Sequence, residues 1–203
     1  MKTLSTHKGQ VMPLNRVNVD TDAILPKQFL KRVERTGYEK FLFHDWRYDD
    51  NGEENENFVL NDPRYKGASI LLGRDNFGSG SSREHAPWAL EDFGFRVLIA
   101  PSFAEIFYNN CFKNGILPIV LKKEEVEVLF EKAFNIDSYS LQVDVKQQTI
   151  RDDDQLIYHF DLEDSQQERL LKGMDDIEIT MKMDSEIAKF EKERRSWLTP
   201  KRA

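Results

Sequence analysis

This chain has very little cysteine, no long apolar run and no excess of positive charge. It has one cysteine, Cys111, which excludes an internal disulfide and any metal cluster held by several cysteines of this chain. No stretch approaches the roughly 20 apolar residues that a membrane helix needs. The first ten residues have no apolar core of the kind that a secretory signal contains. We therefore expect a cytoplasmic protein without a membrane span.

The balance of charged residues bears on which partners the chain can bind. Lys and Arg total 29 against 36 Asp and Glu, for a net charge of −7, which argues against nonspecific binding of nucleic acid. Four histidines (His7, His44, His85 and His159) are scattered without the spacing of metal ligands, so we assign no metal to this chain. With 39% hydrophobic residues over 203 positions, the chain can form a folded domain with a core.

In the middle of the chain, predicted strands and helices alternate regularly. Apolar segments at residues 68–73, 96–102 and 117–121 predict three buried strands. Helices are predicted between them, at 84–93 and 103–115, and Gly94 and Gly115 are placed to end these helices. Strand, helix, strand, helix, strand predicts an α/β fold with a compact βαβαβ parallel core and right-handed crossovers.

The flanking regions predict a β-rich periphery around this core, within a single domain spanning 1–203. Residues 8–26 suit strands and turns, a short helix is expected to end at Gly37, and 47–67 is a long polar loop. A helix at 124–134 precedes a predicted hairpin of strands 139–145 and 155–162. Residues 163–203 form a C-terminal extension with helices predicted at 165–174 and 184–198. Between them, alternating apolar residues favour a strand at 176–183.

The segment GSGSSREH, residues 78–85, lies between a predicted strand and a predicted helix. A helix N-terminus exposes unpaired N–H groups and the positive end of the helix dipole, so it favours anions. Gly78 and Gly80 allow a sharp turn and a close approach. Ser81 and Ser82 add hydroxyl groups, and the planar fork of Arg83 matches a carboxylate or a phosphate. The pattern predicts an anion site with the serines in the turn or at the helix cap.

Other interpretations of this segment fit less well. A P-loop requires Lys after its last glycine, whereas Gly80 is followed by two serines. A dinucleotide fingerprint requires a third glycine where Arg83 stands. A nucleophilic serine would need a departure from GxSxG and has no acid–histidine pair at a matching spacing. A purely structural turn remains open, in which the serines cap the helix and Arg83 pairs with a carboxylate.

Three segments together resemble a known family. DNFGSGSSREHAPWAL, NVDTDAILPKQFL and PSFAEIFYNNCFKNGILPI are similar to the small, swivelling domain of the aconitase superfamily. The similarity is greatest to the bacterial small subunits of 3-isopropylmalate dehydratases and spans nearly the whole chain. The resemblance implies the β/β/α swivelling-domain fold.

The resemblance also implies roles for residues. Ser81 would be the catalytic base, and Ser82 and Arg83 would contact the substrate carboxylate. Gly78, Gly80, Glu84 and His85 complete the motif in supporting roles; His85 would brace the turn through hydrogen bonds. Asp20, Thr21 and Asp22 would support the site from nearby. Arg32, beside Lys31 and Arg35, is a candidate for a second carboxylate, and ordinary surface charge explains it equally well.

In this family, water is removed from 2-isopropylmalate and added back one carbon over, a step of leucine biosynthesis. A [4Fe–4S] cluster on a separate large subunit accepts the leaving hydroxyl, which implies an obligate heteromer that acts on a dicarboxylate. A dry helix N-terminus would stabilise the serine alkoxide. Two alternatives remain: a related hydro-lyase for a citramalate-type or homoaconitate-type diacid, and a noncatalytic anion-binding module.

Overall fold

The computed structural model describes residues 1–32, 34–154 and 157–193. Its chain divides into two compact units, Met1–Gly173 and Met174–Ala203. The first unit is built on a seven-stranded sheet in the order β4-β3-β2-β1-β5-β6-β7. Within the described residues, no helix has both the length and the apolar character needed to cross a membrane.

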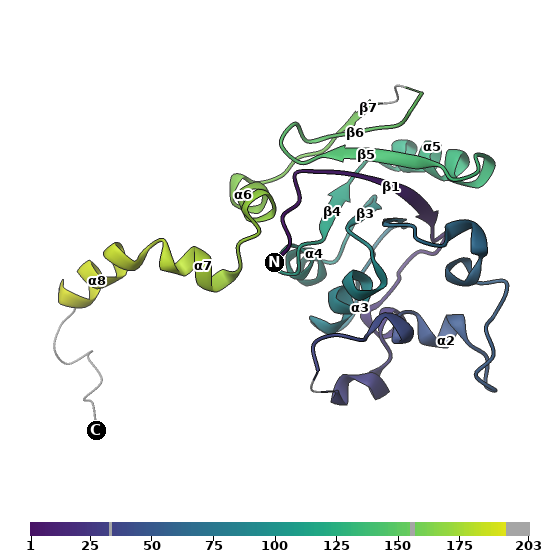
Figure 1. Ribbon diagram of the computed structural model, residues 1–203, viewed down its shortest axis with the longest axis horizontal. Coiled ribbons are helices and arrows are strands. Elements are labelled where there is room, and N and C mark those ends of the chain that lie inside the picture. Colours follow the sequence, from purple (N-terminus) through teal and green to yellow (C-terminus); the bar gives the residue numbers. More distant parts are fainter. Residues whose placement is uncertain (33, 155–156, 194–203) are drawn as a thin grey trace. The chain divides into compact units, whose positions relative to one another are not determined.

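Four parallel strands form the centre of the first unit (Figure 1): β1 (Thr6–Pro13), β2 (Ile70–Leu72), β3 (Val97–Ala100) and β4 (Leu117–Val120). Helices α3 (His85–Phe93) and α4 (Glu105–Lys113) connect β2 to β3 and β3 to β4. Gly94 and Gly115 follow these helices with φ of 117° and 73°, a conformation that glycine adopts readily. The predicted βαβαβ core is therefore confirmed.

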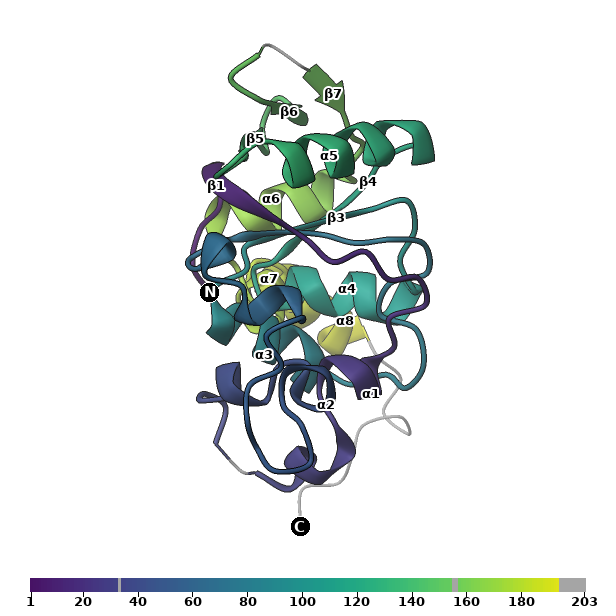
Figure 2. The same ribbon diagram turned by 90° about the vertical axis from the view of Figure 1, so that its right-hand side faces the viewer.

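The apolar runs that predicted these strands are buried on both faces of the sheet. Val11, Ile70 and Ile99 face one hydrophobic cluster, together with Leu129 and Phe130 of α5 (Lys123–Asn135). The alternate strand residues, among them Met12, Leu71 and Leu98, face a second cluster with Ala89 and Leu90 of α3. Helices α5 and α3 accordingly lie on opposite sides of the strands (Figure 2). Burial on both faces explains why these strands read as continuous apolar runs.

The antiparallel part of the sheet differs from the predicted hairpin. Strand β5 (Ser140–Asp144) pairs with β1 and with β6 (Thr149–Arg151), which in turn pairs with β7 (Ile157–His159). The polar segment 146–154, predicted to be a connection, thus contributes a strand of its own. Ile150 is buried and supplies the apolar contact that holds this short strand.

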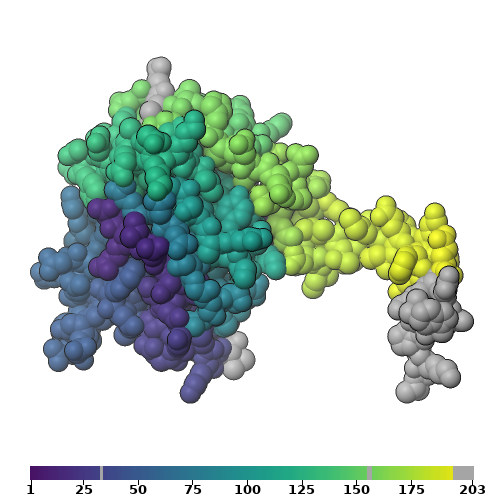
Figure 3. Space-filling view, turned by 180° about the vertical axis from the view of Figure 1, so that it is seen from behind, coloured from purple at the N-terminus to yellow at the C-terminus, as the bar shows by residue number. Residues whose placement is uncertain are grey.

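The remaining elements of the first unit precede β2 or follow β7. They are α1 (Thr21–Ile24), α2 (His44–Arg47), α6 (Asp164–Lys172) and 3-10 helices at Lys27–Lys31, Glu39–Phe41, Val59–Asn61 and Pro63–Tyr65. In the space-filling view, residues from about 40 to 65, coloured blue, form one end of this unit (Figure 3). The green residues of β5 to β7 form the other end (Figure 3).

The second unit contains α7 (Asp176–Met181) and α8 (Asp184–Glu193). The prediction of a strand at 176–183 is wrong. A helix forms there instead, and a capping box stabilises its start. Asp175 accepts a hydrogen bond from the backbone N–H of Glu178 at 2.8 Å, and the Glu178 carboxylate accepts one from the Asp175 N–H at 2.9 Å. Helix α8 begins at Asp184 as predicted, and the part of that prediction beyond residue 193 lies outside the described residues.

Candidate active site

The GSGSSREH turn extends the sheet beyond the carboxyl ends of its parallel strands. Asp20 forms an isolated parallel bridge with Ser79, and Phe77 forms one with Phe103. The N–H of Gly78 donates to the carbonyl of Val19 at 2.7 Å. Three segments that are far apart in the sequence, 17–21, 75–81 and 102–107, therefore lie side by side at the carboxyl edge of the sheet. Ligand sites of open α/β sheets commonly lie at this edge.

The two glycines of the turn are required for different reasons. Gly78 has φ +78°, and a Cβ at this position would lie 2.1 Å from Cγ of Phe107. Gly80 has φ +91°, but the nearest side-chain atoms to its Cβ position, on Asp20 and Thr21, are 3.5 Å away. Gly78 thus allows the turn to pack against α4, whereas Gly80 supplies only the backbone conformation.

Ser81 and Ser82 lie in the turn and not at the helix cap. Helix α3 begins at His85, with exposed Glu84 in the N-cap position and no side-chain capping bond. The carbonyl of Ser81 accepts hydrogen bonds from Thr21 Oγ1 and from the N–H of Arg83, both at 2.9 Å. These bonds fix the Ser81 backbone. Both serines are exposed in this chain, so the dry environment expected for Ser81 is absent here.

Arg83 is paired with Asp22 through an ion pair from its Nη1 to Oδ1. The other Asp22 oxygen lies 3.8 Å from Nζ of Lys27. Asp20 caps α1 by accepting a hydrogen bond from the N–H of Ala23 at 2.7 Å. Asp20, Thr21 and Asp22 therefore each reach the turn or its supporting helix through a separate contact.

His85 is held by aromatic packing. Its ring centroid lies 4.6 Å from that of Trp88 and 5.8 Å from that of Tyr38. Burial lowers the pKa of His85, with Glu84 opposing and Arg83 reinforcing the shift. Among the described residues its ring has no hydrogen-bond partner, so tilted and edge-to-face ring contacts stand where hydrogen bonds were predicted.

Arg32 reaches the same aromatic cluster from another direction. Its guanidinium carbon lies 5.8 Å from the centroid of Tyr38 and 5.2 Å from that of Phe41. Its only ion pair among the described residues is with Glu34, at 3.7 Å. Arg32 and His85 therefore both contact the ring of Tyr38.

Sequence reasoning missed the aromatic residues around the site. Tyr38 and Trp88 hold His85, and Phe107 packs on Gly78. Trp88 and Phe107 stand on predicted helices, where an aromatic side chain is indistinguishable from ordinary core. The available signal was that Phe103 and Phe107, like Trp88, lie within the segments that carry the family resemblance.

The part of the chain that the structure describes offers few ligands for a metal or a cluster. Among the described residues, no group of three or more His, Cys, Asp or Glu side chains converges where it could hold a metal ion. Cys111 is fully buried in α4, as predicted for a structural cysteine, and burial raises the pKa of its thiol. A buried thiol with a raised pKa is a poor metal ligand.

Comparison with known proteins shows the class of protein to which this chain belongs. The sequence pattern of the Aconitase C-terminal domain family matches residues 1–124, more than half of the chain. A crystal structure of 3-isopropylmalate dehydratase (leuD) from Methanocaldococcus jannaschii has the same fold, with a TM-score of 0.64. At 24% identity, it covers 91% of this chain and 98% of its own.

Two bacterial relatives give the particular family. The 3-isopropylmalate dehydratase small subunit of Brevibacillus brevis is 54% identical over 96% of this chain and 100% of its own length. That of Bacillus subtilis is 52% identical over 98% of this chain and 99% of its own length. The chain belongs to the family of 3-isopropylmalate dehydratase small subunits.

Proposed function

We propose that this chain supplies the serine-bearing half of a hydro-lyase that interconverts 2-isopropylmalate and 3-isopropylmalate, and that it is active only with a separate large subunit. The observation that carries the proposal is the GSGSSREH turn itself. It presents Ser81 and Ser82 at the surface while its backbone is held by Val19 and Thr21. A rigid turn with exposed functional groups is a site that a second protein surface can complete.

In this proposal Ser81 is the base that removes the proton from the carbon next to a substrate carboxylate. Its hydroxyl needs a dry, positively polarised environment to act as an alkoxide. Helix α3 contributes its N-terminal dipole, and the N–H groups of His85 and Ala86 belong to its first turn. Covering the exposed turn with a partner surface would remove the water and strengthen these interactions.

Arg83 and Ser82 bind a substrate carboxylate in this scheme. The guanidinium of Arg83 is neutralised by Asp22 when no substrate is present. A carboxylate of the substrate would replace Asp22, whose other oxygen already faces Lys27. This exchange keeps Asp22 paired, so substrate binding would not leave an uncompensated charge.

The leaving hydroxyl requires a Lewis acid, which a [4Fe–4S] cluster held by the large subunit would supply. The single, buried Cys111 supports placing the cluster on the partner. A free thiol also supports a reducing, cytoplasmic setting.

The test is reconstitution. The chain is mixed anaerobically with a cluster-loaded large subunit, and alkene formation from 2-isopropylmalate is followed by ultraviolet absorbance. We expect activity only in the mixture and a preference for 2-isopropylmalate over citramalate and homocitrate. Activity of this chain alone would contradict the divided site. Equal rates on all three compounds would contradict the assignment of 2-isopropylmalate as the substrate. Substrate binding without turnover would favour the noncatalytic module.

A further inference from the structure

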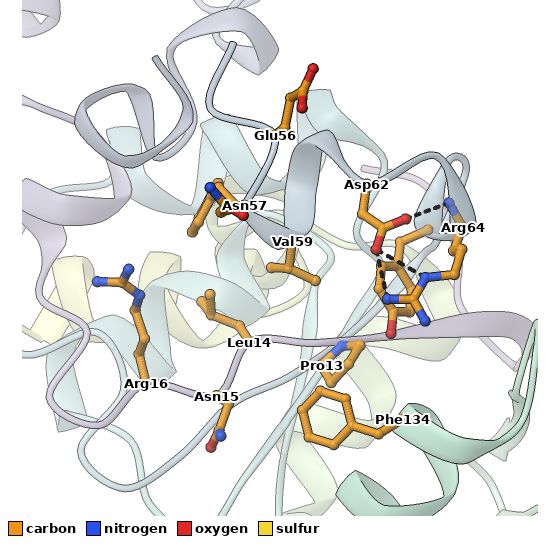
Figure 4. Close-up of a pocket in the computed structure, with 12 residues that line it drawn as sticks. Pro13, Leu14, Asn15, Arg16, Glu56, Asn57, Val59, Asp62, Arg64 and Phe134 are labelled. Carbon is orange, nitrogen blue, oxygen red and sulfur yellow. Dashed lines mark hydrogen bonds and ion pairs between the residues drawn. The ribbon is translucent and has the colours of Figure 1, made fainter. Parts of the chain in front are cut away.

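A cavity separate from the serine turn lies beside the carboxyl end of β1. Its volume is about 370 Å³, within the range of about 300 to 1,000 Å³ that small-molecule sites occupy. The end of β1 and the loop after it form one wall, residues 56–65 form a second, and Phe134 at the end of α5 forms a third (Figure 4). No residue predicted for the active site lines this cavity.

Arg16 stands at one end of the cavity with its positive charge unmatched. Its guanidinium carbon lies 4.2 Å from the ring centroid of Trp46 and 5.9 Å from that of Phe58. No carboxylate of the described residues lies within ion-pair distance of it, whereas Arg64, Arg74 and Arg83 are each paired with one. Stacking on Trp46 orients the guanidinium in advance, which lowers the entropic cost of binding an anion.

The two acidic residues of the lining do not cancel this charge. Asp62 is bound by Arg64 through hydrogen bonds of 2.9 and 2.7 Å, at the end of the cavity opposite Arg16 (Figure 4). The hydrogen bonds from Arg64 lower the pKa of Asp62, so this pair stays ionised and internally neutral. The carboxylate of Glu56 points away from the other lining residues (Figure 4). The lining as a whole is formally neutral, and its positive charge is local to the Arg16 end of the cavity.

The centre of the cavity is apolar. Leu14 and Val59 lie between Arg16 and the Asp62–Arg64 pair, and Phe134 closes the wall beside Pro13 (Figure 4). Phe134 is 48% exposed, so its ring is available to a ligand. An apolar group placed here would bury hydrophobic surface on both sides.

We propose that this cavity binds a small carboxylate with an apolar tail. The carboxylate pairs with the guanidinium of Arg16, and the tail lies against Leu14, Val59 and Phe134. Arginine suits this role because its planar fork meets both oxygens of a carboxylate. The proposal stands on this cavity alone and does not depend on the proposed function.

The site would share a support with the serine turn. Two residues after Arg16, the N–H of Asn18 donates to the carbonyl of Asp75 at 2.9 Å. The side-chain amide of Asn76 also donates to Asn18 Oδ1 at 2.9 Å. A ligand on Arg16 therefore contacts the same loop that holds the active-site turn.

Calorimetric titration of the full chain with 4-methylpentanoate tests the proposal. Two comparison probes separate the contributions: 4-methylpentan-1-ol keeps the tail without the charge, and acetate keeps the charge without the tail. We expect saturable binding of 4-methylpentanoate, and affinity for each comparison probe at least about tenfold weaker. Arg16→Gln should weaken binding of 4-methylpentanoate by roughly tenfold or more. Arg151→Gln, which removes an exposed arginine on β6, is the matched control and should bind like the wild type.

The proposal is overturned if the wild type gives no saturable heat with 4-methylpentanoate. It is also overturned if Arg16→Gln binds like the wild type, or if the alcohol binds as tightly as the acid. Arg16 is exposed, so its replacement leaves the core intact, and a circular dichroism spectrum would verify the fold.

Discussion

At the scale of single residues, Ser81 and Ser82 are neighbours that are both exposed and have different proposed roles. Ser81→Ala should lower kcat by about 10²–10⁴-fold in the reconstituted enzyme, because it removes the base. Ser82→Ala should chiefly raise KM, because it removes one contact to a carboxylate. Steady-state rates with 2-isopropylmalate measure both. Equal effects on kcat from the two changes would contradict the assignment of Ser81 as the base.

Arg83 offers a test of geometry at constant charge. Arg83→Lys keeps the positive charge but loses the planar fork, so we expect kcat/KM to fall by about 10- to 100-fold. Lys27→Arg is a control because Lys27 lies 3.8 Å from the same carboxylate of Asp22 without a proposed substrate contact. Its kinetics should resemble the wild type. Unchanged kinetics of Arg83→Lys would remove Arg83 from the substrate site.

The protonation of His7 should make the stability of the folded chain depend on pH. Its Nε2 lies 2.8 Å from Oγ of Ser69, and burial, reinforced by Arg96, lowers its pKa below the ordinary value of 6.5. A lowered pKa means that the neutral form is favoured in the folded chain, so its contribution is present above pH 6.5 and is lost as the pH falls through the folded pKa. Urea denaturation at pH 7 and at pH 5 should show a smaller loss for His7→Gln than for the wild type. His159→Gln, at an exposed position of β7, should lose as much as the wild type.

At the scale of elements, the packing of the turn on α4 separates the two glycines. Gly78→Ala should cost about 2–4 kcal/mol, since it combines a left-handed backbone with a Cβ overlapping Phe107. Gly80→Ala should cost only about 1–2 kcal/mol, because the backbone conformation is its sole penalty. Chemical denaturation measures both. Phe107→Ala is itself costly because Phe107 is buried in the core, so the informative comparison is the double-mutant cycle. Gly78→Ala should cost less in a Phe107→Ala background than in the wild type, and an equal cost in both would show that the overlap is unimportant.

Elements that carry their own signal could be predicted, and those that depend on distant partners could not. The strands of the parallel core follow from apolar runs because both of their faces are buried. Strand β6 is three residues long and is held by the strands beside it, so its polar sequence did not predict a strand. The alternation of Ile177, Ile179 and Met181 was misleading, although the capping pair Asp175 and Glu178 was visible. In the site, the motif located the turn, but the pairing of Arg83 with Asp22 joins residues 61 positions apart and leaves no local trace.

At the scale of the whole molecule, both hydrophobic clusters lie within residues 1–173, and α6 belongs to one of them through Leu170. Leu170 is fully buried, and its carbonyl accepts a hydrogen bond from the N–H of Leu4 at 2.9 Å. A chain ending at Gly173 should therefore unfold cooperatively, with a Tm within about 4 °C of the full chain, since a difference of about 1 kcal/mol shifts Tm by that amount at this size. Scanning calorimetry of both chains gives the comparison. A chain ending at Glu163 loses α6 and Leu170, so it should melt far lower. If truncation at Gly173 were equally harmful, the second unit would have to belong to the folding core, and the division of the chain at that glycine would be wrong.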